Sequence, residues 1–151
     1  MGTFKSKRLT RHGRSDRGAS LVEFALLMPL LLLLVLGIVE LGWLFSQNND
    51  VRHGAREGAR AAAVNIGNNA TLITETCNSM DLTSATTVQF TDAAPGNVGQ
   101  IGMVEVVATV DSLSGVNLIE VFLPSTLTST VEFRLEQPSS LWSTDGSPVS
   151  C

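Results

Sequence analysis

The feature that most constrains this chain is one uninterrupted apolar run near its N-terminus. From Phe24 to Phe45 the sequence reads FALLMPLLLLLVLGIVELGWLF, 22 residues whose only ionisable member is Glu40. A helix of that length reaches about 33 Å, enough to cross a hydrocarbon core of about 30 Å. The run therefore predicts a transmembrane helix over residues 24–45. Pro29 removes an amide donor, so we expect a kink near residues 25–29.

The charges flanking this run differ in sign. Residues 1–17 carry six Lys and Arg against the single acid Asp16, whereas residues 46–151 carry four Arg against eleven acids. Basic residues beside a span favour the cytoplasmic side, so we expect the N-terminus in the cytoplasm and the C-terminal domain outside. A basic flank can also indicate nucleic-acid binding, but its position beside a span favours the membrane interpretation, with lipid and not nucleic acid as the partner.

Removal of the whole run as an ordinary signal peptide is not expected. Such peptides have an apolar region of about 7–15 residues followed closely by small residues at the cleavage site. Here the run is longer, and the polar segment SQNND, residues 46–50, follows it. The span is therefore expected to stay in the mature protein as an anchor.

Beyond the span, the chain predicts more helix and then a small sheet. The segment VRHGAREGARAAAVNI, residues 51–66, separates an arginine stripe from an apolar stripe, so one long helix over about 20–66 is expected, with a shorter helix over 70–80. Within it, Gly54 and Gly58 form a GxxxG pattern, which outside lipid indicates little beyond close packing. Alternating Thr- and Val-rich stretches predict strands over 86–91, 103–111 and 129–136, with a turn at Pro95–Asn97. The fold class is therefore α+β, with the long helix packed on an antiparallel sheet of three or four strands.

The most informative motif lies where the basic flank meets the apolar run. It reads RGASLVEF, from Arg17 to Phe24. This string resembles the type IV prepilin processing site, in which a peptidase cuts after glycine and leaves a glutamate as fifth residue of an apolar helix. Counted from Ala19, Glu23 is fifth. The longer string RGASLVEFALLMPLLLLLVLGIVELGWLF, followed by REGARAAAV, resembles the TadE-like family of the Flp/Tad pilus over residues 17–64.

The resemblance implies a type IV pilin-like architecture and roles for individual residues. It divides the chain into a basic leader at 1–18, an N-terminal pilin helix at 19–66 and an extracytoplasmic α+β domain at 67–151. Cleavage between Gly18 and Ala19 would leave the anchor in the membrane. The resemblance then assigns assembly roles to Glu23, which would pair with the α-amino group of a neighbouring subunit, to the adjacent Phe24, and to Glu40. A Glu23 that merely lies at the membrane interface, and a Glu40 solvated there, are the alternatives.

By this resemblance the chain is a minor pilin, or pseudopilin, needed to assemble a pilus for surface adhesion. Its partners would be other pilin subunits, a prepilin peptidase and the inner-membrane assembly platform. It would lie in the bacterial cytoplasmic membrane and could pass into a surface pilus. A pseudopilin of a type II secretion system and an uncleaved single-pass anchor that presents a small binding domain are the alternatives.

The sequence offers no pattern for catalysis or for a bound cofactor. His12 and His53 lack neighbours that would form a catalytic triad or a metal site, so neither an enzyme activity nor a metal is expected. The two cysteines, Cys77 and Cys151, both follow the span and would meet oxidising conditions outside the cytoplasm. We expect a disulfide between them. Two free thiols remain the alternative, because the pairing geometry cannot be derived from sequence.

Overall fold

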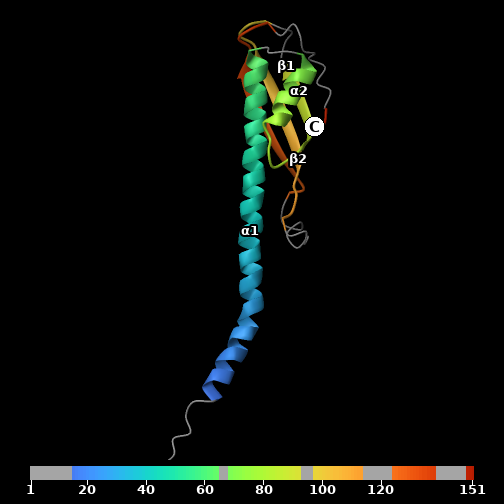
Figure 1. Cartoon of the computed structure of the whole chain (residues 1–151). Coiled ribbons are helices and arrows are strands. Elements are labelled where there is room, and N and C mark those ends of the chain that lie inside the picture. The colour runs from blue at the N-terminus through green and yellow to red at the C-terminus, as the bar shows by residue number, and fades with distance from the viewer. Residues whose placement is uncertain (1–14, 65–67, 93–96, 114–123, 139–148) are drawn as a thin grey trace, which may run out of the picture. The chain divides into compact units, whose positions relative to one another are not determined.

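The computed structural model describes residues 15–64, 68–92, 97–113, 124–138 and 149–151. These contain two helices and three strands, α1 (Ser15–Ala63), α2 (Asn69–Asn78), β1 (Ala85–Asp92), β2 (Ile101–Thr109) and β3 (Thr126–Arg134), as Figure 1 shows. A long N-terminal helix is packed on a three-stranded antiparallel sheet, which confirms the predicted α+β class. The chain divides into two compact units, Met1–Ile38 and Val39–Cys151, which we call the N-terminal and C-terminal units.

In the N-terminal unit, the structure describes the first half of α1. The large apolar side chains from Leu21 to Leu36 are all between 44% and 75% exposed, so no other segment that the structure describes covers them. The helix changes direction within its blue N-terminal part, which includes Pro29 (Figure 1). It begins at Ser15, earlier than the predicted start at residue 20, because adding a turn to an existing helix costs much less than starting a new one.

The sheet of the C-terminal unit is an antiparallel meander in the order β1-β2-β3. On β2, alternate residues are buried, and Val104, Val106 and Ala108 form the centre of the inner face. β3 follows the predicted alternation near its end: Phe133 and Leu135 are buried, and the charged residues between and beside them are exposed. The predicted strands overlap all three observed ones. The predicted turn falls mostly on residues 93–96, outside the described residues.

The second half of α1 supplies one side of the core. Val51, Ala55, Ala59 and Ala62 recur at helical spacing and are at most 4% exposed, in one apolar cluster with the inner face of the sheet. The small side chains on this face of α1 let the helix approach the strands closely. The helix ends at Ala63, whose carbonyl accepts a hydrogen bond of 2.8 Å from the amide of Glu136 just after β3.

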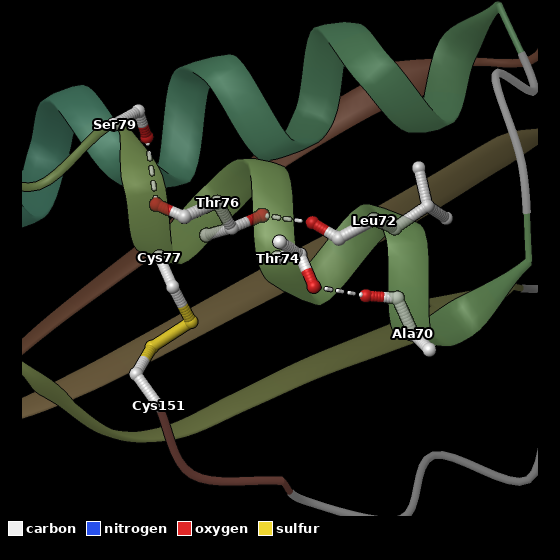
Figure 2. The surroundings of a disulfide bond; sticks show 7 residues. All are labelled: Ala70, Leu72, Thr74, Thr76, Cys77, Ser79 and Cys151. Atoms are coloured by element: carbon white, nitrogen blue, oxygen red, sulfur yellow. Dashed lines mark hydrogen bonds between the residues drawn. A yellow bond between two sulfur atoms is a disulfide. The ribbon is translucent and has the colours of Figure 1, made fainter.

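α2 lies beside α1 at the two glycines of the GxxxG pattern. A Cβ added at Gly54 would stand 2.6 Å from Cγ of Met80, and one added at Gly58 would overlap Oγ1 of Thr76. Thr76 is fully buried, and its hydroxyl donates to the carbonyl of Leu72 within α2 (Figure 2). Because Gly54 and Gly58 have no side chains, α2 can pack closely against this part of α1. This is the close packing that the GxxxG pattern predicts outside lipid.

Candidate functional site

The predicted processing motif lies in the N-terminal unit, on the first turns of α1. Gly18, Ala19 and Phe24 are exposed, and a Cβ added at Gly18 would have no heavy atom within 4 Å. The backbone at this position is therefore accessible from outside the molecule. Being helical, this segment would have to unwind locally to lie extended in a peptidase, and its glycine lowers the cost of that change.

Glu23 is the one charged side chain between Gly18 and Val39. It is exposed among the leucines and valines of α1, and within the described part of the chain its carboxylate has no hydrogen-bond or ion-pair partner. A carboxylate in such apolar surroundings favours a cationic partner when the helix enters lipid. The structure therefore leaves Glu23 available for an intermolecular contact, and its role in assembly stays a prediction.

Three polar side chains at the other end of the apolar run fasten α1 to the segment after β2. Trp43 Nε1 and Gln47 Nε2 donate to the carbonyl of Asp111 over 2.9 and 2.6 Å, and the amide of Asp111 donates to Gln47 Oε1 over 3.1 Å. Glu40 Oε2 accepts from the amide of Leu113 over 3.3 Å. We call Glu40, Trp43 and Gln47 the clamp. Their spacing places them on one face of the helix.

The clamp changes the interpretation of the apolar run. Its last residues, Val39–Phe45, belong to the C-terminal unit, although Leu41 and Phe45 are still 53% and 68% exposed. The predicted span over residues 24–45 stays a prediction. Glu40 is only 7% exposed and accepts a backbone hydrogen bond in its own chain, unlike a carboxylate solvated at an interface. A contact of Glu40 with another subunit stays a prediction. Trp43 and Gln47 were not among the predicted site residues, although their i+3 and i+7 spacing from Glu40, which places all three on one helix face, was a signal for them.

The arginine stripe is exposed along α1. Arg60 makes an i, i+3 ion pair of 3.5 Å with Glu57, whereas Arg52 and Arg56 have no acidic partner among the described residues. His53 lies beside them, and its Nδ1 is 3.1 Å from the carbonyl oxygen of Ser79, an arrangement that fits the Nδ1–H tautomer. His53 thus acts as a structural contact between α1 and the end of α2.

The two cysteines form a disulfide between α2 and the C-terminus. Their Cα atoms are 5.8 Å apart, within the usual range for a disulfide (Figure 2). The tail also lies along the free edge of β1, where Val149 and Val88 exchange hydrogen bonds of 2.7 and 3.1 Å. This geometry matches the pairing expected from the sequence. No cluster of three potential metal ligands occurs in the part of the chain that the structure describes.

The structure places the predicted residues in three separate regions. Gly18, Ala19, Glu23 and Phe24 lie together on α1, Glu40 lies in the clamp, and the cysteines lie at α2. By length and composition α1 can cross a membrane over Gly18–Ala63, and its most apolar stretch is not buried in the protein.

Comparison with known families bears on this same helix. Residues 18–60 match the TadE-like protein family. The resemblance is confirmed over this TadE-like segment, which includes residues 18–24 of the predicted processing motif, the whole apolar run and the arginine stripe as far as Arg60. No curated protein and no solved structure matches the chain.

The family match and the exposed helix support two broad conclusions. The TadE-like family is associated with the Flp/Tad pilus and is not an enzyme family, so the chain is expected to work with other pilus components. The exposed apolar part of the TadE-like segment indicates anchoring in a membrane.

Proposed function

We propose that this chain is a minor pilin, or pseudopilin, required to assemble a Flp/Tad-type pilus that serves surface adhesion. A prepilin peptidase would remove residues 1–18 on the cytoplasmic side, and the helix from Ala19 would remain in the cytoplasmic membrane. Residues 67–151 would lie outside. Other pilins and the inner-membrane platform would then draw the subunit into the pilus.

The observation that carries this proposal is the TadE-like segment itself. Its first half is a helix whose large apolar side chains are exposed among the described residues, and it begins at the glycine of the RGASLVEF motif. A helix of this kind suits lipid before assembly and the apolar interior of a filament afterwards, because both environments are water-free. An enzyme would not need a helix that can exchange lipid for the apolar interior of a filament.

N-terminal sequencing of the protein from cells with and without the prepilin peptidase tests the proposal. We expect the sequence to begin at Ala19 with the peptidase and to retain the leader without it. The same uncleaved N-terminus in both strains would favour the plain membrane anchor.

Deletion of the gene separates the pilus from the secretion alternative. We expect fewer surface pili and weaker adhesion, with normal secretion of soluble proteins. Normal piliation combined with a secretion defect would instead support a type II secretion pseudopilin.

A further inference from the structure

A polar groove in the C-terminal unit lies between α1 and the outer side of β3. It has a volume of about 340 Å³ and is open to solvent, and its lining combines two cations with hydroxyl-bearing strand residues, namely Arg52, Arg56, Thr128, Ser129, Thr130 and Val131. Neither the processing motif nor the clamp contributes to it. Its composition therefore calls for an explanation separate from anchoring.

The hydrogen bonds at the two ends of β3 show which of its backbone groups face this groove. The carbonyl of Ser125 accepts from Val110 over 3.1 Å, and the amide of Leu135 donates to Gln100 over 2.9 Å, so these two residues point toward β2. Backbone direction alternates along an antiparallel strand. Thr128 and Thr130 lie an odd number of positions from Ser125 and Leu135. Their amides and carbonyls therefore point away from β2. Among the described residues these groups have no hydrogen-bond partner.

The charge of the groove is also unbalanced. Arg52 and Arg56 are both exposed, and no described carboxylate pairs with either, whereas the next arginine of the stripe is paired with Glu57. An open strand edge beside two unpaired guanidinium groups presents backbone donors and acceptors together with positive charge. This combination fits an extended segment that carries carboxylates.

The spacing of the two arginines indicates where the carboxylates would lie. Arg52 and Arg56 are one i, i+4 step apart, about 6 Å along the helix axis. Residues on one face of a strand repeat every second position, about 6.6 Å apart. The strands run lengthwise beside α1 (Figure 1). Acidic residues at positions i and i+2 of an added strand would therefore meet the two guanidinium groups.

We propose that this groove binds an extended segment of another protein, which adds as a strand to the open edge of β3 and places two carboxylates, spaced by one residue, against Arg52 and Arg56. The chain's own 14 Asp and Glu residues contain no pair with this spacing, so a second copy does not supply the motif. The occupant is therefore a different protein. The inference does not depend on the pilus role.

Binding of defined peptides to the full chain in detergent micelles tests the proposal by fluorescence anisotropy. The probe is a fluorescein-labelled, Thr- and Val-rich peptide with a central Glu-Val-Glu, compared with the same peptide carrying Gln-Val-Gln. We expect the acidic peptide to bind about tenfold or more tightly than the neutral one. The double variant Arg52→Gln, Arg56→Gln should remove this preference, and Arg60→Gln, the matched control, should keep it.

A second variant examines the strand edge independently of charge. Thr130→Pro removes an amide that points away from β2 and leaves the β2–β3 hydrogen bonds in place, as proline is tolerated on the open side of edge strands. It should weaken peptide binding without a change in the thermal unfolding of the protein. Equal binding of the acidic and neutral peptides, an equal loss in Arg60→Gln, or unchanged binding in a folded Thr130→Pro protein would each overturn the proposal.

Discussion

At the scale of single residues, Asp50 on α1 organises the segment between α2 and β1. Its carboxylate accepts hydrogen bonds of 2.9 to 3.0 Å from the amides of Asp81, Leu82 and Thr83 and from the hydroxyl of Thr83. Partial burial alone would raise the pKa of this carboxyl. The hydrogen bonds from Asp81, Thr83 and Leu82 outweigh burial, so the pKa lies below its usual value of 3.8.

The lowered pKa of Asp50 gives the stability of the C-terminal unit a pH dependence with a defined sign. The unfolded chain binds the proton more tightly, so the contribution of Asp50 is complete above pH 3.8 and is lost as the pH falls through the lower folded-state pKa. Asp50→Asn should cost about 2 kcal/mol at neutral pH, because its amide cannot accept all four bonds. Urea unfolding at neutral and acid pH measures both effects. An equal cost of the substitution at pH 2 and pH 7 would contradict this reading.

Gly58 is a residue at which an added methyl group should be harmful. Its Cβ would meet the buried Thr76 hydroxyl and lie 3.4 Å from Cζ of Phe90, so Gly58→Ala should destabilise the C-terminal unit by about 1–3 kcal/mol. Gly42→Ala is the matched control, because nothing lies within 4 Å of that position and alanine favours helix. Urea unfolding should show a loss for Gly58→Ala and none for Gly42→Ala.

Glu23 allows the assembly role to be separated from simple anchoring. Glu23→Gln keeps the size of the side chain and removes its charge, so the variant should insert in the membrane and be cleaved after Gly18 as before. If the carboxylate pairs with the amine of a neighbour, the variant should be absent from sheared surface pili. Immunoblots of membrane and sheared fractions measure this. Normal incorporation of the variant would leave Glu23 with an interfacial role only.

At the scale of elements, the sequence predicted the parts whose pattern is local. The apolar run predicted α1, and alternation in β3 predicted which side chains face the core, because both patterns repeat within a few residues. What it could not supply is contact between distant segments. Gly54 and Gly58 indicated close packing, but the sequence did not show that α2 is the partner. Gln47 lies in a polar segment, and nothing local indicates its hydrogen bond to Asp111, 64 residues away.

The disulfide connects α2 to the C-terminal tail, and its removal should loosen both. Closing a loop with a sequence separation of 74 is worth about 4 kcal/mol in the chain-entropy model. Cys77→Ser with Cys151→Ser should therefore lower the urea midpoint strongly and speed hydrogen exchange at Val88, whose amide bonds to the tail. Thiol labelling of the non-reduced wild-type protein is the control, and it should detect no free thiol.

At the scale of the whole molecule, the two parts of α1 have different surroundings. α1 leaves its apolar side chains uncovered in the N-terminal unit and buries small ones against the sheet in the C-terminal unit. The change from exposed to packed side chains occurs at the clamp, since the clamp begins just after the division at Ile38. The covered and uncovered parts of α1 therefore follow each other within one helix, without a linker.

The orientation of that unit can be tested in spheroplasts. The charge difference across the apolar run predicts that residues after 46 lie outside the cytoplasmic membrane. Protease added from outside should digest the C-terminal unit once the disulfide is reduced, while a cytoplasmic marker stays intact. Protection of the C-terminal unit until the membrane is lysed would reverse the assignment.

The disulfide also determines how this protein responds to mechanical load. A force applied through α1 cannot draw out the residues between Cys77 and Cys151, because the disulfide closes them into a covalent loop. At about 3.4 Å per extended residue, the separation of 74 withholds about 250 Å of potential extension. The three strands of a subunit under tension would therefore stay within one covalent loop.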